Sequence, residues 1–145
     1  MITTTLTPGQ VSLVRESFGR IAPIADVAGA LIYERIFFLA PEARGLFGDD
    51  IAAQGARLMH AVARAVEALD RPEELRPFLE RLGERHVRYG VVPAHFEVVG
   101  AAVMWALGQG LGEHFTEDVR DAWATVFGSI QEAMLVGMSR VSQAA

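Results

Sequence analysis

The apolar positions of this chain recur three and four residues apart, which is the period of helices with one buried face. The first such stretch follows Thr7-Pro8-Gly9-Gln10. A capping hydroxyl, a proline at the first helical position and a glutamine three residues after the threonine favour a helix start there. We therefore expect a helix over about residues 8–20, with Val11, Val14 and Phe18 turned inward.

Prolines, aspartates and glycines mark where further helices begin and end. Pro41, Asp50, Pro72 and Pro93 are suited to helix starts, and Gly90 is suited to a left-handed helix end. The pattern predicts helices over about residues 24–39, 41–47, 51–69, 72–88, 93–111 and 116–140. No strand or hairpin pattern competes with this all-α prediction.

Composition and charge limit the domain organisation and the partners. The chain has 145 residues, 51% of them hydrophobic, and a mean hydropathy of +0.25, so we expect one domain over residues 1–145 with a substantial core. Thirteen basic against eighteen acidic residues give a net charge of −5 without a basic block, which argues against nucleic acid as a partner. The absence of cysteine fits a reducing compartment. The longest apolar stretch, residues 98–108, is too short to cross a bilayer, so we expect a cytoplasmic protein with no membrane partner.

The residue spacings exclude several kinds of catalytic centre. A two-histidine site on one helix needs a second histidine four residues on, and a di-iron bundle needs a glutamate three residues before each histidine. None of the four histidines meets either condition. The glycine-rich segment 108–112 follows no strand, which favours a flexible helix end over a phosphate loop. Because no nucleophile–base pair is evident either, we expect a cofactor to carry any demanding chemistry.

Two glycines inside predicted helices suggest a close helix crossing. Gly29 and Gly55 each cost about 1 kcal/mol relative to alanine unless tight packing compensates. A crossing there would bring Tyr33 and Gln54 towards the same cavity, with Leu58 on the same face as Gln54. Helical spacing alone favours Tyr33 and Gln54 as ordinary surface or boundary residues.

Five segments of the chain resemble the globin family, specifically bacterial single-domain haemoglobins of the neuroglobin-like and Vitreoscilla-type groups. They are LIYERIFFLAPEARGLF (31–47), QGARLM (54–59), LGERHVRYGV (82–91), HFEVVG (95–100) and FTEDVRDAW (115–123). The resemblance covers nearly the whole chain and implies a three-over-three helical sandwich around haem b, iron protoporphyrin IX. It also implies that Phe47 lies against the haem. The 32 residues from Gln54 to His86 match the family's spacing between the distal residue and the proximal histidine.

By this resemblance His86 is the proximal ligand of the haem iron. A neutral imidazole nitrogen is a good donor to ferrous iron, and the other ring N–H can bond a helix carbonyl, for which we expect that of Leu82. The residue pattern alone also fits a solvated histidine on a helix face. We expect His60, His95 and His114 to be boundary or surface residues.

On the distal side, the resemblance places Gln54 where the usual distal histidine would be, with the phenol of Tyr33 nearby. Two donors would stabilise bound dioxygen, and one hydrogen bond worth about 1.5–3 kcal/mol changes affinity roughly tenfold or a little more. We therefore expect high oxygen affinity with slow release. Gln54 coordinates iron poorly, so the sixth position should be empty or hold water. Leu58, Val91, Phe96 and Val99 occupy places that line haem in relatives, and Arg57 either pairs with a haem propionate or is solvated.

One departure from the family limits the functional prediction. Flavohaemoglobin-type globins support the proximal histidine with a tyrosine and a glutamate. Here Phe96 takes the tyrosine's place and Met138 lies near the glutamate's, which weakens the electronic push on the imidazole.

Three functions therefore remain open. The first is reversible binding of dioxygen for storage, delivery or sensing, with carbon monoxide and nitric oxide as further diatomic ligands. The second is nitric oxide dioxygenation with a cellular reductase as partner, because 145 residues leave no room for a flavin and nicotinamide domain. The third is a haem-free, globin-like interaction domain.

Overall fold

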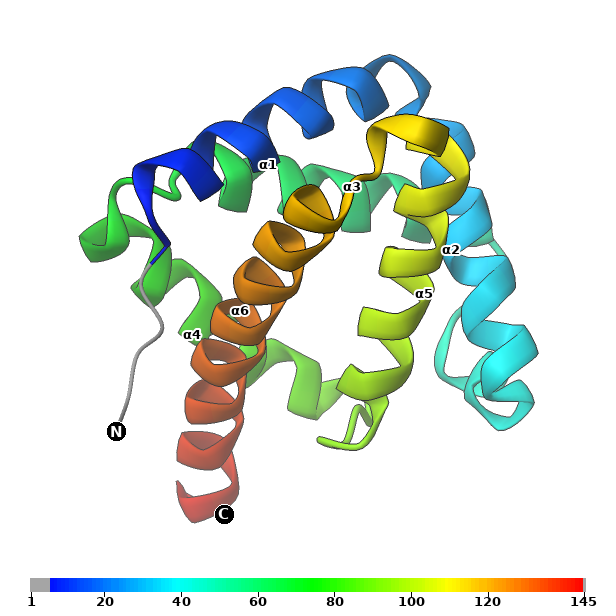
Figure 1. Ribbon diagram of the computed structural model, residues 1–145. Coiled ribbons are helices and arrows are strands. Elements are labelled where there is room, and N and C mark those ends of the chain that lie inside the picture. The colour runs from blue at the N-terminus through cyan, green and yellow to red at the C-terminus, as the bar shows by residue number, and fades with distance from the viewer. Residues whose placement is uncertain (1–5, 145) are drawn as a thin grey trace.

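The computed structural model describes residues 6–144, and every regular element in that range is a helix (Figure 1). This confirms the all-helical prediction. The ends of the helices differ from the predicted ones by at most four residues, as at the last helix, which continues to Ala144. The elements are α1 (Pro8–Ile21), η1 (Ala22–Ile24), α2 (Ala25–Leu39), η2 (Pro41–Leu46), α3 (Ile51–Glu67), α4 (Pro72–Arg88), α5 (His95–Leu111), η3 (Gly112–His114) and α6 (Glu117–Ala144).

Local capping explains why the helix ends could be predicted. The Thr7 hydroxyl accepts a hydrogen bond from the backbone N–H of Gln10 (3.1 Å), and the Gln10 side chain accepts one from the backbone N–H of Thr7 (3.0 Å). After the C-terminal end of α4, Gly90 adopts φ = 83°. This left-handed conformation favours glycine and ends the helix. Of the three residues expected to point inward from α1, Val14 is fully buried, whereas Val11 and Phe18 are partly buried.

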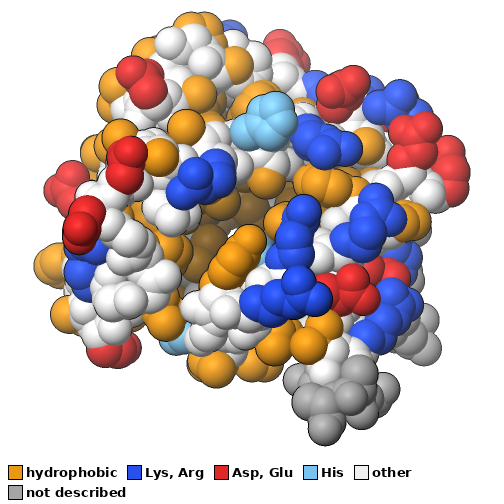
Figure 2. Space-filling model, turned by 180° about the vertical axis from the view of Figure 1, so that it is seen from behind, with side chains coloured by type: hydrophobic (Ala, Val, Ile, Leu, Met, Phe, Trp, Pro, Cys, Tyr) orange, Lys and Arg blue, Asp and Glu red, His pale blue; other side chains and the backbone are white. Residues whose placement is uncertain are grey.

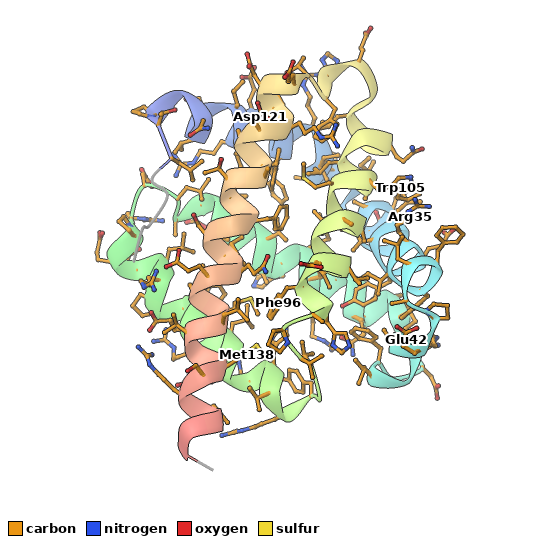
Figure 3. All side chains as sticks on the ribbon, turned by 60° about the horizontal axis from the view of Figure 1, so that its bottom comes forward. Arg35, Glu42, Phe96, Trp105, Asp121 and Met138 are labelled. Carbon is orange, nitrogen blue, oxygen red and sulfur yellow. The ribbon has the colours of Figure 1, made fainter. Side chains whose placement is uncertain are left out.

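The helices form two hydrophobic clusters of unequal size. The larger cluster joins α1, α2, α3, α5 and α6 around side chains such as Trp123, Val14 and Val126. On its outer side, the guanidinium of Arg35 lies over the rings of Phe38 (4.7 Å) and Trp105 (4.9 Å), which links α2 to α5 (Figure 3). The smaller cluster forms where α4 packs on α6, and Leu79, Ala133 and Met134 are its buried members.

Two helix crossings depend on glycine. A Cβ atom on Gly29 would lie 2.9 Å from the carbonyl oxygen of Gly55, so α2 and α3 can approach this closely only without side chains there. This confirms the predicted crossing. The second crossing, between α4 and α6, was not anticipated. A Cβ atom on Gly83 would overlap the backbone carbonyl of Met134, and one on Gly137 would overlap that of Glu80.

Candidate cofactor-binding site

A hollow opens on the face of the molecule seen in Figure 2. Hydrophobic side chains form its walls, and basic side chains stand around much of its rim. Because the sequence contains no lysine, these basic side chains are arginines. The helix α4 packs mainly on α6 and makes few contacts with α3 or α5 in the part of the chain that the structure describes.

The structure distributes the predicted site residues over four helices and two connecting segments. Nearly all of them are partly buried. Tyr33 is more buried, with 7% of its surface exposed, whereas Arg57 is exposed. The residues are Tyr33 on α2, Phe47 after η2, Gln54, Arg57 and Leu58 on α3, His86 on α4, Val91 after α4, and Phe96 and Val99 on α5.

Three aromatic rings meet where α2 and η2 come together. The ring of Tyr33 lies edge-on to that of Phe47, with 5.0 Å between centroids. Phe37 completes the group at 6.0 Å from Tyr33 and 5.7 Å from Phe47. Phe37 was not among the predicted site residues, although its position four residues after Tyr33 places it on the same helix face. These contacts fix the orientation of the Tyr33 ring without using its hydroxyl.

Burial keeps the Tyr33 phenol protonated. Removal from solvent raises its pKa above the usual value, and the nearby positive charge of Arg57 opposes this rise only in part. At neutral pH the hydroxyl is therefore a hydrogen-bond donor. No hydrogen bond joins the side chains of Tyr33 and Gln54 among the described residues, and the Gln54 amide bonds no other described group, so both remain available to a ligand.

The geometry of His86 leaves one ring nitrogen free. Its Nδ1 atom lies 2.7 Å from the carbonyl oxygen of Leu82, which confirms the predicted hydrogen bond. Because a carbonyl can only accept, Nδ1 must carry the proton, and in the neutral ring Nε2 then has an unshared electron pair. Burial lowers the pKa of His86, the bond to Leu82 raises it, and the charge of Arg85 lowers it further, with a net decrease. The imidazole is therefore neutral at pH 7 and able to bind a metal ion.

The other histidines do not have this environment. His60 and His114 are exposed, and the Nδ1 atom of His95 accepts a hydrogen bond from the backbone N–H of Val92 (3.1 Å) at the start of α5. This confirms their assignment as boundary or surface residues. In the described range 6–144 there is no group of three or more acidic or histidine side chains placed to hold a metal ion. His86 therefore offers a single ring nitrogen to a metal ion, which would suit an iron already held by a porphyrin.

Apolar side chains occupy the positions expected to support His86. Phe96 is partly buried and packs against the smaller hydrophobic cluster, and Met138 is buried with 6% of its surface exposed (Figure 3). Neither side chain can form a hydrogen bond of the kind a phenol or a carboxylate forms. An apolar hollow in the surface and a partly buried imidazole with one free ring nitrogen would together suit a flat, apolar cofactor with an axially bound metal.

Comparison with known proteins agrees with this arrangement. The Globin family model matches residues 30–134, and the chain belongs to the globin family. It is 32% identical to a flavohemoprotein of Bordetella parapertussis over 139 residues, which are 91% of this chain but 34% of that protein. The chain thus spans about a third of the length of this relative.

Two further proteins match over most of their length. A neuroglobin of Tetraodon nigroviridis is 26% identical, with 88% of this chain and 89% of the relative covered. A solved structure of a hexacoordinated heme protein from an anhydrobiotic tardigrade superposes with a TM-score of 0.86 at 18% identity, covering 92% of this chain and 96% of the other. This superposition confirms the predicted globin fold. In the part of the chain that the structure describes, no helix has the length and apolar character needed to cross a membrane.

Proposed function

We propose that this globin binds dioxygen reversibly on a haem b group, with His86 as the protein ligand of the iron. The observation that carries the proposal is the 2.7 Å contact between His86 Nδ1 and the Leu82 carbonyl, which leaves Nε2 as the free donor. Haem iron supplies reversible binding of diatomic gases, including carbon monoxide and nitric oxide. We also propose that residues 1–145 form one globin domain and that the protein is cytoplasmic.

The distal residues would then set the affinity. The protonated Tyr33 hydroxyl and the unbonded Gln54 amide can donate hydrogen bonds to a ligand that carries partial negative charge. Each such bond is worth about 1.5–3 kcal/mol, so the two donors support high affinity and slow release. Gln54 replaces a potential imidazole ligand, which leaves the sixth coordination position to water or to the gas.

The remaining predicted residues would enclose the porphyrin. The side chains of Phe47, Leu58, Val91, Phe96 and Val99 are apolar and partly buried, so a porphyrin would cover their remaining exposed surface and they would exclude water from its face. Arg57 is exposed and forms no ion pair among the described residues, which leaves its guanidinium available for a propionate.

Absorption spectra of the purified protein test the proposal directly. We expect a Soret band, and in His86→Gly we expect loss of the haem or altered axial ligation that added imidazole restores. His60→Ala is the matched control, because His60 is an exposed histidine and should leave the ferric, ferrous and carbonyl-bound spectra unchanged. If His86→Gly retained unaltered ligation, the assignment of His86 would be wrong. A wild-type protein without a Soret band would instead support a haem-free interaction domain.

A second candidate is oxidation of nitric oxide to nitrate by dioxygen, with electrons from a reductase. The 32% identity to a flavohemoprotein favours it, whereas the apolar Phe96 and Met138 on the proximal side count against efficient turnover. Many turnovers of nitric oxide in the presence of a cellular reductase would support this activity. A single stoichiometric burst would leave reversible oxygen binding as the function.

A further inference from the structure

The outer face of α4 carries a row of exposed arginines. Arg81, Arg85 and Arg88 are four and three residues apart, which places them on one side of the helix, and all three are exposed. None of them forms an ion pair among the described residues, whereas Arg76 on the same helix pairs with Glu80 (2.9 Å). An acidic chain of net charge −5 thus presents a locally basic surface beside the candidate site.

Exposed apolar side chains continue this surface beyond the end of α4. Tyr89 exposes 59% of its surface and Val92 exposes 48%. Tyrosine and arginine are enriched where proteins bind other proteins, because both combine a large contact area with polar groups. We define the α4 patch as Arg81, Arg85, Arg88, Tyr89 and Val92.

The α4 patch is in direct contact with the candidate iron ligand. The ring of Tyr89 lies edge-on to the imidazole of His86, with 5.6 Å between their centroids. A protein bound to the patch would therefore lie one side chain away from the ligand of the iron. Two exposed apolar residues offer little anchorage in a bilayer, so the position of the patch and its charge favour a soluble redox protein over a lipid surface.

We propose that the α4 patch is the docking surface for an acidic one-electron donor, namely a reduced iron–sulfur or flavin protein. This inference rests on the proposed function, because it assumes that His86 holds iron. In the step, the donor would lose one electron and ferric iron would gain it to become ferrous; a water held by the ferric iron would leave unchanged, and no proton moves. The arginines orient the donor, and the Tyr89–His86 contact provides the short path.

A plant-type [2Fe–2S] ferredoxin is a suitable acidic probe. Stopped-flow reduction of the ferric holoprotein by reduced ferredoxin should slow as salt is added, because salt screens the attraction. The double variant R81E/R88E should lower the second-order rate constant at low salt by about tenfold or more. The matched control is R20E/R120E, which changes the net charge by the same amount. Arg20 and Arg120 are also exposed arginines without ion pairs among the described residues. They lie outside the α4 patch, on α1 and near the start of α6.

Binding can be measured separately from electron transfer. Oxidised ferredoxin added to the ¹⁵N-labelled protein should shift backbone NMR signals of residues 81–92, and R81E/R88E should abolish these shifts. Equal rates and equal salt dependence for the two double variants would overturn the proposal, as would binding to phosphatidylserine vesicles with no response to ferredoxin. Each variant is first checked for the wild-type Soret band. If the wild-type protein lacks haem, the proposed function fails, and the NMR titration still decides whether the patch binds an acidic protein.

Discussion

The two sides of the candidate site are connected to the protein in different ways. Tyr33 lies on α2, which crosses α3 at Gly29 and Gly55 and also packs on α5, within the larger hydrophobic cluster. His86 lies on α4, which packs mainly on α6. At the crossing of α4 and α6, Gly83 faces the backbone carbonyl of Met134 rather than a second glycine.

The two candidate ligand-binding residues therefore differ in how many packing interfaces fix their positions. Neighbours on several sides fix the position of Tyr33, and its hydroxyl is not needed for packing. The position of His86 depends on the α4–α6 crossing and on the ion pairs beside it, which join Glu80 to Arg76 (2.9 Å) and to Arg140 (2.7 Å). Gly83 lies next to Leu82, whose carbonyl fixes the ring of His86, so the crossing holds both partners of that hydrogen bond.

The largest effect is expected for Gly83→Ala. The added methyl group would overlap the carbonyl of Met134, which no side-chain rotation can relieve, so the free energy of unfolding should fall by about 3 kcal/mol. Urea denaturation measures this loss. Gly128→Ala in α6 is the control: nothing lies within 4 Å of its added Cβ, and it should stabilise the protein slightly. Equal results for the two variants would show that the α4–α6 contact is not close.

Gly29→Ala should have a smaller effect at the other crossing. Its Cβ would meet the Gly55 carbonyl at 2.9 Å, a conflict that a small shift of α3 can reduce, so we expect a loss of about 1–2 kcal/mol. Gly19→Ala, with open space around its added Cβ, is the control in the same denaturation series. A loss as large as that of Gly83→Ala would remove the proposed difference between the crossings.

Tyr33→Phe separates the chemistry of the distal side from its packing. The ring contacts with Phe37 and Phe47 remain, so stability should change little, while the dioxygen dissociation rate constant should rise roughly tenfold because one donor is lost. Flash photolysis or stopped-flow mixing gives this rate. An unchanged rate would mean that the Tyr33 hydroxyl does not reach the bound gas.

Glu80→Gln tests the ion pairs of Glu80 with Arg76 and Arg140 beside the α4–α6 crossing. The Glu80 side chain is 13% exposed, but its arginine partners are 34% and 55% exposed, so solvent screening limits the expected loss to about 0.5–1 kcal/mol. The difference from wild type should shrink in high salt. Glu16→Gln, at an exposed glutamate without an ion pair among the described residues, is the control and should have no measurable effect.

The smallest expected effect is that of alkaline pH on the distal donor. Burial raises the pKa of Tyr33, so the midpoint at which the donor is lost lies above the usual tyrosine value of about 10. The dioxygen dissociation rate constant should therefore stay constant from about pH 7 to about pH 9. An acceleration with a midpoint below pH 10 would contradict the direction of this shift.

Much of the fold could be predicted because its determinants are local. The capping box at Thr7 and the left-handed Gly90 act within a few residues, and so does the bond from His86 to Leu82, one helical turn away. The crossing at Gly29 and Gly55 was predicted because both glycines interrupt helices that are otherwise continuous.

The missed features depend on contacts that the sequence does not display. Gly83 and Gly137 are far apart in the chain, and nothing in the pattern pairs them. The ring contact between His86 and Tyr89 follows from helical spacing, but its importance appears only once both the exposure of Tyr89 and the free nitrogen of His86 are known. Likewise, the separation of α4 from α3 and α5 is a property of the assembled helices.

Attachment of α4 mainly to α6 gives this globin a natural first step of partial opening. Native-state hydrogen exchange should find α4 as a separate cooperative unit whose amides become exposed before those of α2 and α3. Such an opening would widen the hollow while the larger cluster stays folded. A newly made chain could then bind a porphyrin by opening α4 alone, without unfolding the rest of the domain.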